Sequence, residues 1–315
     1  MPLAEGEWNL SYSSNGIYPD ANFTFGTFSS GYYLLDPTPY EITYEDVDSG
    51  DTPNPRRDGV RLGQDFRGKA TISFEIGVDT VDASPTRLGR HGANLDALSA
   101  LEQAWDAQAV RRRFGTPAVL RTTQGGRARR FYGRPRKAAP APSRLTRQGY
   151  TAVVATFVSV DGIAYDDVEQ VATVTMNPAP HRGLKGPLTT PLKMTGQGAT
   201  KVPGEILVKG TRPTPAVITI YGPVTKPSCE LVGKWTVGLD LTLAAGERVV
   251  IDSRSWALTV LRNGSASVAG NLTRASPKLP ELLLPTGRQD LVLRGSDATG
   301  RSYMTVAWRD AYAYL

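Results

Sequence analysis

The sequence predicts a mainly β protein of two sandwich-like domains, with one α-helix in the first domain. Three observations support this. The chain has 315 residues, more than one ordinary hydrophobic core accommodates. Its 32 glycines and 23 prolines suit many tight turns between short strands. Near its end, Met304, Val306 and Trp308 alternate with polar or small residues, which is the period of a half-buried strand.

The C-terminal third is the densest series of strand and turn signals. Residues 249–251 form a short β-branched run, and 256–261 follow as a second strand that ends at Asn263-Gly264. Asn-Gly favours a type I′ turn because both central residues need a positive φ. A further strand at 291–294 then turns through 295–300 into the final strand at 303–308. The pattern predicts a β-sandwich.

The N-terminal half contains several shorter strand patterns. We expect one hairpin with arms at 60–63 and 70–78, and a second with arms at 118–122 and 128–132 that turns at 124–126. Residues 48–59 combine acids, prolines and glycines and are expected to form a projecting loop. A Pro-Ala bend is expected at 138–142, and further strands are expected at 151–160 and 168–176.

Residues 94–113 carry the one pattern that predicts a long helix. Four large apolar residues recur at spacings of three and four and therefore share one core-packing face: Leu95, Leu98, Leu101 and Trp105. Asn94 is the expected N-cap, because its side-chain oxygen can accept an orphan backbone N–H. Asp96 in the first turn and the arginines 111–113 in the last would suit the helix dipole.

These patterns divide the chain into an N-terminal domain at 1–176, a crossing rich in proline and glycine at 177–204, and a C-terminal sandwich at 205–315. No run of eighteen apolar residues predicts a membrane span. The N-terminus also lacks the basic and apolar regions of a secretory signal. The single Cys229 excludes a disulfide within the chain.

Motifs for chemistry are missing from the sequence. His91 and His181 are both expected in loops, and neither belongs to a metal-binding spacing. No phosphate loop or nucleophile elbow occurs. Asp166 and Asp167 are adjacent on the chain, so as strand residues they would point to opposite faces and would not converge on one bond. We therefore expect no catalytic residue, cofactor or metal, and do not expect an enzyme.

Charge is distributed unevenly along the N-terminal half. Residues 1–65 hold three basic and eleven acidic side chains, whereas residues 107–160 hold twelve basic and no acidic ones. The two sets could pair within one folded domain. Alternatively they could pair between copies, since in a cyclic oligomer one patch meets a different patch of the next subunit and opposite charges would set the register.

Several segments, taken in order, resemble a known family. The stretches WTVGLDLTLAAGERVVIDSRSWALTVLRNG and LPTGRQDLVLRGSDATGRSYMTVAWRDAY resemble the C-terminal domain of distal tail (Dit-like, or minor tail) proteins of siphophages, of the type found in phages of actinobacteria. PTPAVITIYGPV is similar to the strand that opens that domain. GQDFRGKATISFEIGV, the helix after it, and RRFYGRPRKAAP resemble the N-terminal, ring-forming domain.

The resemblance implies a structural function in the virion. The N-terminal domain would form a hexameric ring at the tip of a long non-contractile tail, between the tail tube protein and the tail-associated hub protein. The C-terminal domain would be a galectin-like sandwich that holds receptor-binding or fibre proteins. Such a protein is assembled in the host cytoplasm, inserts into no membrane, and meets DNA at most transiently in the channel.

Within this picture the basic segment is the expected site. We expect Arg129, Arg130, Arg134, Arg136 and Lys137 to form an intersubunit surface or, less favoured, a surface that faces DNA in the channel. The alternative function is a host-surface glycan-binding adhesin that uses the C-terminal sandwich. In that case one of Trp235, Trp256 and Trp308 would stack on a sugar, although at least two of the three are expected in the core.

Overall fold

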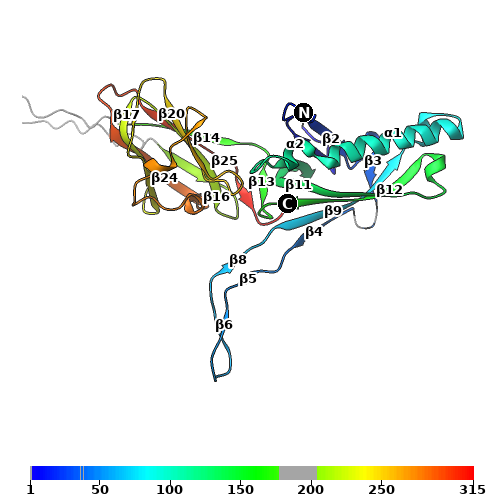
Figure 1. Cartoon of the computed structure of the whole chain (residues 1–315), viewed down its shortest axis with the longest axis horizontal. Coiled ribbons are helices and arrows are strands. Elements are labelled where there is room, and N and C mark those ends of the chain that lie inside the picture. The colour runs from blue at the N-terminus through cyan, green and yellow to red at the C-terminus, as the bar shows by residue number, and fades with distance from the viewer. Residues whose placement is uncertain (1, 36, 38, 177–203) are drawn as a thin grey trace, which may run out of the picture. The chain divides into compact units, whose positions relative to one another are not determined.

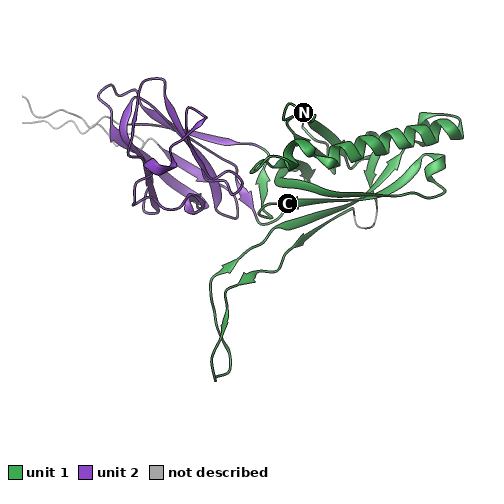
Figure 2. Cartoon of the chain, viewed as in Figure 1, with its two compact units in different colours: residues 1–167, 313–315 green, residues 168–312 purple. Residues whose placement is uncertain are grey.

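The computed structural model describes residues 2–35, 37, 39–176 and 204–315. The chain divides into two compact units (Figure 2): unit 1 is Met1–Asp167 with Ala313–Leu315, and unit 2 is Val168–Tyr312. The boundary thus lies earlier in the chain than the sequence placed it. The reason is β14 (Gln170–Thr175), which was expected to end the first domain but pairs with β25 (Tyr303–Trp308) inside unit 2. The expected crossing lies outside the described residues apart from Gly204.

Unit 1 is built on one large antiparallel sheet with strands in the order β2-β1-β10-β11-β12-β9-β3. Two further strands, β4 and β13, pair with β9 and β11 respectively. The bounds are β1 (Trp8–Tyr12), β2 (Ala21–Phe25), β3 (Tyr32–Leu34), β4 (Tyr40–Tyr44), β9 (Ala70–Asp79), β10 (Ala118–Gln124), β11 (Arg127–Ala141), β12 (Tyr150–Ser159) and β13 (Ala164–Asp166), with short 3-10 turns at Phe28–Ser30, Val81–Ala83 and Thr146–Gln148.

The hairpin of β10 and β11 confirms the turn predicted from the sequence. Gly125 and Gly126 have φ angles of 58° and 69°, and both values lie in the left-handed region that a type I′ turn requires. The return strand is longer than predicted. It runs through the stretch expected as a Pro-Ala bend, because residues 137–141 continue to pair with β12.

The predicted helix exists but begins earlier and ends earlier than expected. It is α1 (Arg87–Asp106), capped by Thr86, whose hydroxyl accepts the backbone N–H of Gly89 at 3.1 Å. Ala107 then adopts a left-handed conformation with φ 46°, and the short α2 (Gln108–Arg111) follows. His91 therefore lies on α1 and not in a loop.

Asn94 is a buried residue within α1 and not its N-cap. Its amide donates to the backbone carbonyls of Val78 at 3.3 Å and Gly149 at 3.1 Å, and its carbonyl accepts the Thr151 hydroxyl at 2.7 Å. These partners come from two strands and a loop that are distant in sequence. They satisfy a buried amide that the sequence pattern alone would place at a helix start.

The core of unit 1 lies between α1 and one face of the sheet. Phe74 is packed edge-to-face between Trp8 and Phe25, with ring centroids 4.9 Å and 5.1 Å away. Trp105 of α1 joins this cluster at 5.5 Å from Phe25, and its indole N–H donates to the carbonyl of Thr156 at 3.0 Å. Aromatic pairs of this geometry stabilise a core beyond simple burial.

A long two-stranded ribbon, residues 45–69, extends from β4 and β9 (Figure 1); we call it the arm. Its strands are β5 (Asp48–Ser49), β6 (Thr52–Pro53), β7 (Val60–Arg61) and β8 (Asp65–Phe66), paired β5 with β8 and β6 with β7. The predicted hairpin of 60–63 with 70–78 is therefore wrong, because 60–61 pairs back to 52–53. The projecting loop expected at 48–59 is instead the outgoing strand and tip of this arm.

Unit 2 is a two-sheet sandwich, as predicted. One sheet has the order β14-β25-β16-β20-β21-β22 with β23 beside β16, and the other has β15-β24-β17-β18 with β19 beside β17. The bounds are β15 (Glu205–Val208), β16 (Thr214–Tyr221), β17 (Val224–Leu231), β18 (Trp235–Gly238), β19 (Thr242–Leu243), β20 (Arg248–Asp252), β21 (Thr259–Arg262), β22 (Ala266–Ser267), β23 (Leu283–Leu284), β24 (Gly287–Ser296) and β26 (Ala311–Tyr312), with 3-10 turns at Ala269–Asn271 and Leu279–Glu281.

The local signals of this region are confirmed with one exception. Asn263 and Gly264 have φ angles of 52° and 81° and turn β21 into β22. The strand before this turn begins at Thr259, so Trp256 lies outside it. The turn at 295–300 joins β24 and β25, which belong to opposite sheets. It is therefore a crossing between the two layers of the sandwich.

The final strand presents its apolar residues to the core. Met304 and Val306 are fully buried and Trp308 is 6% exposed. The Trp308 indole N–H lies 3.2 Å from a carboxylate oxygen of Asp310, which it donates to. A buried Trp whose polar edge has a partner is a strong anchor for the sandwich.

Replacing Trp308 with Ala should lower the free energy of unfolding of unit 2 by about 3–5 kcal/mol, since a large cavity replaces a buried ring. Denaturant unfolding of the full chain, followed by fluorescence and calorimetry, measures this. The matched control is Leu207→Ala at an exposed position of β15, with an expected change of about 0.5 kcal/mol or less. A similar small loss for Trp308→Ala would show that the ring is not an anchor.

Candidate interaction surfaces

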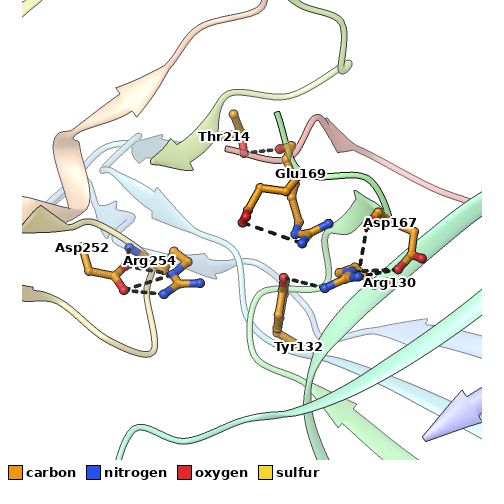
Figure 3. Close-up of polar contacts among 8 residues, drawn as sticks. Arg130, Tyr132, Asp167, Glu169, Thr214, Asp252 and Arg254 are labelled. Atoms are coloured by element: carbon orange, nitrogen blue, oxygen red, sulfur yellow. Dashed lines mark hydrogen bonds and ion pairs between the residues drawn. The ribbon is translucent and has the colours of Figure 1, made fainter. Parts of the chain in front are cut away.

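The structure separates the five basic residues that the sequence grouped as one surface. Arg129 and Arg130 are largely buried on β11 and pair with carboxylates of their own unit. Arg129 lies 3.3 Å from Asp166. Arg130 contacts Asp167 with Nη2 at 2.6 Å and Nε at 2.9 Å (Figure 3). The two adjacent aspartates therefore serve as ion-pair partners within unit 1.

Arg130 has the more complete set of contacts. It also donates to the backbone carbonyl of Asp167 at 3.1 Å and to the Tyr132 hydroxyl at 3.5 Å. Burial alone would lower the pKa of Arg130, but its hydrogen bonds to Tyr132 and Asp167 outweigh burial and raise it. A charge-assisted, nearly bidentate pair of this kind is a structural contact of the domain.

Arg134 is also occupied by its own chain. Its guanidinium donates to the carbonyl of Thr116 through Nε at 3.1 Å and Nη2 at 2.9 Å, and to the carbonyls of Arg113 and Arg111. It thereby caps the C-terminal end of α2. Burial and then the charge of Arg136 lower the pKa of Arg134.

Arg136 and Lys137 are the two members of the group that are exposed. β11 pairs with β12 as far as Pro135 and again from Lys137, so Arg136 is the extra residue of a β-bulge. A bulge re-aims side chains at the point where it occurs. Of the predicted surface, this pair remains at the surface of unit 1, and the other three arginines contact their own unit.

A second basic surface lies at the end of α2, where the sequence predicts only the last turn of a helix. Arg111, Arg112, Arg113 and Phe114 are all exposed, Phe114 completely. The loop before β2 lies beside them, because the Arg112 guanidinium is 5.2 Å from the ring centroid of Tyr18. Ile17 next to Tyr18 is 84% exposed. We call residues 111–114 with Ile17 and Tyr18 the basic corner.

The outgoing strand of the arm carries the opposite charge. Residues 45–53 hold four acidic side chains and no basic one, whereas the whole arm, residues 45–69, holds six acidic and five basic side chains. Large apolar side chains are exposed along it: Val47, Val60, Leu62 and Phe66. The basic corner combines arginines with the exposed Phe114, and the arm combines acids with exposed apolar side chains. The two surfaces are therefore complementary in charge, and both expose apolar area that a contact could bury.

The described residues contain no group of His, Cys, Asp and Glu that could hold a metal ion. None of the described helices is long and apolar enough to span a membrane. Cys229 is buried in unit 2, where burial raises the pKa of its thiol to about 12. His181 lies outside the described residues.

Comparison with known proteins gives matches among solved structures alone. No family model matches the chain, and no curated protein matches it. A chain of the phage P2 baseplate in its activated conformation with calcium is 7% identical, with 98% of this chain and 99% of that chain covered and a TM-score of 0.50. The corresponding strontium structure is 7% identical over the same shares of the two chains, with a TM-score of 0.47.

The Dit protein of phage SPP1, described as a paradigm of the hub adsorption apparatus in phages that infect Gram-positive bacteria, is also similar. It is 11% identical, with 86% of this chain and 98% of that chain covered and a TM-score of 0.49. At these identities the likeness, carried by the P2 baseplate chain, is one of fold. The mainly β fold in two units that the sequence predicts is confirmed, and the P2 baseplate chain shares it.

Replacing Arg130 with Ala should lower the free energy of unfolding of unit 1 by about 1–3 kcal/mol, because the partly buried Asp167 carboxylate loses its charged partner. Calorimetry of the full chain measures the effect. Arg136→Ala, at the exposed bulge, is the control and should change stability by about 0.5 kcal/mol or less. Equal, small effects of both variants would contradict the structural role of the Arg130–Asp167 pair.

Proposed function

We propose that this chain is a structural component of a phage tail tip. Six copies would form a ring through unit 1, and the ring would join the tube of a long non-contractile tail to the hub and adsorption apparatus below it. The partners would be the tail tube protein, the tail-associated hub protein and receptor-binding or fibre proteins held by unit 2. The protein would assemble in the host cytoplasm and remain in the virion, with no catalytic role.

The sheet face of unit 1 opposite α1 is the observation that carries this proposal. Helix α1 packs on the face that bears Phe74, while the other face presents the alternate residues of the same strands. These are small, hydroxylated or modest in size: Thr71 and Ser73 on β9, Ala152, Val154, Thr156 and Val158 on β12, and Ala139 and Ala141 on β11. The charged residues that the register places on this face beside them are Glu41, Glu75, Arg134 and Lys137.

Such a face suits the wall of a water-filled channel. A large apolar face would need a second protein layer to cover it, whereas hydroxyls and small side chains tolerate water. Few positive charges also suit a passage for DNA, because each phosphate contact adds affinity and a channel must let DNA slide. The face therefore supports a ring whose sheets surround the channel.

The proposal predicts a hexamer that weakens with salt. Mass measurement and electron microscopy of the full chain, alone and with the tail tube protein, should show six-fold rings at about 0.1 M salt and smaller species at about 1 M. The Debye length falls from about 10 Å to about 3 Å over that range. Pairing between the acidic residues 1–65 of one copy and the basic residues 107–160 of the next would then be weaker.

Mass spectrometry of purified phage particles provides the second readout. The chain should be present in a few copies per virion and located at the tail tip by antibody labelling. Its absence from purified particles, or a monomer that never joins rings in the presence of the tube protein, would contradict the proposed function.

A second candidate function, binding of host glycans by unit 2, is favoured by one feature. Two hollows of about 580 and 560 Å³ lie along β18 and share Thr236. The first is bordered by Asn271, Arg274 and other polar side chains, and the second by Trp235. Amide, guanidinium and indole groups are suited to sugar hydroxyls and ring faces.

If this second function holds, the full chain should bind a defined set of oligosaccharides on a glycan array, and the double variant Asn271→Ala with Arg274→Ala should lose most of that binding. The variant's unfolding curve controls for folding. No binding to any surface glycan of the host, or equal binding by the variant, would remove these hollows as a sugar site.

A further inference from the structure

The arm of unit 1 presents a surface that its own unit does not cover. Leu62 is 79% exposed and Phe66 is 58% exposed, on the strand that returns from the tip. On the opposite strand, Asp46 and Asp48 flank the exposed Val47. An extended ribbon this rich in exposed apolar side chains is costly in water and favours a partner.

The basic corner is held in one conformation by contacts within unit 1. Arg134 donates hydrogen bonds to the backbone carbonyls of Arg111, Arg113 and Thr116. The loop from β1 is tied to the same region by two contacts: Tyr12 donates its hydroxyl to the carbonyl of Ala104 at 3.0 Å, and Tyr18 lies under Arg112. A surface held in one conformation before binding loses less entropy when it binds.

We propose that the arm of one copy docks on the basic corner of a second copy, with Leu62 and Phe66 against Phe114 and Ile17. This inference rests on the proposed ring and names the contact that closes it. The acids of the arm would face Arg112 and Arg113, since Arg111 already pairs with Asp106 at 2.7 Å. The contact is heterologous, since each copy contributes one arm and one corner, and repetition of such a contact closes a ring when the rotation permits.

A second copy is favoured as the occupant because both halves of the contact occur on every chain. The outgoing strand of the arm, residues 45–53, is acidic and the corner is basic, and both surfaces expose apolar side chains next to their charges. Complementary charge gives register and suppresses contacts between two arms or two corners. Desolvated arginines beside aromatic rings also add cation–π attraction, as Arg112 over Tyr18 already illustrates.

Cysteine cross-linking of the full chain tests the contact directly. Cys229 is buried with a thiol pKa of about 12, so it forms little reactive thiolate and does not compete. The double variant Leu62→Cys with Phe114→Cys should give disulfide-linked chains in steps up to a hexamer on a non-reducing gel under ring-forming conditions. Leu62→Cys with Leu95→Cys, at an exposed site of α1, is the matched control and should give at least about tenfold less cross-linking.

Charge reversal provides an independent readout. Arg112→Glu with Arg113→Glu should weaken self-association by about tenfold or more while the unfolding curve of unit 1 stays unchanged, since both side chains are exposed. Adding Asp48→Lys and Asp65→Lys on the arm should restore association. A merely structural role for these arginines would not produce this rescue.

The outcomes separate the two proposals. If rings form normally but no disulfide links residues 62 and 114, the proposed arm-to-corner contact is wrong, while the proposed ring is not contradicted. A chain that forms no rings even with the tube protein present would overturn the proposed function itself. Cross-links that join the arm to a tube or hub protein would also overturn the contact and identify the arm as a surface for another partner.

Discussion

The packing of Trp105 and Phe74 is the contact on which unit 1 depends. It places α1 against one face of the sheet, and the indole N–H of Trp105 ties the helix to the backbone of β12. Because the helix covers one face alone, the other face stays available and can carry small, hydroxylated side chains. The long strands β9 and β12 are anchored by the same cluster, and the chain can continue beyond it as the arm.

Charge in this chain is used for two different purposes. Arg129 and Arg130 pair with adjacent aspartates, and Arg134 caps the end of a helix, so these side chains maintain the shape of unit 1. Arg111–Arg113 and the acids of the arm lie at the surface. A count of charges along the sequence cannot separate these two groups, because exposure depends on which partners the fold brings close.

Unit 2 achieves its stability in a simpler way. Its two sheets alternate inward-facing apolar residues, and their interior includes Ile218, Ile220 and Val306 from one sheet with Leu231 and Leu291 from the other. The described members of this cluster are all apolar side chains, and the buried Asp252 at the end of β20 pairs with Arg254. The hollows along β18 are bordered by residues that this core does not need for its packing, such as Asn271 and Arg274.

The sequence by itself determined the features that depend on local sterics. The turns at Gly125-Gly126 and Asn263-Gly264 need positive φ angles, and the alternation in 303–308 needs only the two-residue period of a strand. Residues near in sequence decide such features.

The tertiary structure alone decided the features that depend on distant partners. From the sequence alone Asn94 looks like a helix cap, but in the structure its amide donates to the buried carbonyls of Val78 and Gly149. The strand at 170–175 looks like the end of the first domain, but it pairs with β25 of unit 2. The ion pairs of Arg129 and Arg130 and the position of the basic corner belong to the same class. Their free energy comes from contacts between residues far apart in the chain, and no local pattern encodes which contacts those are.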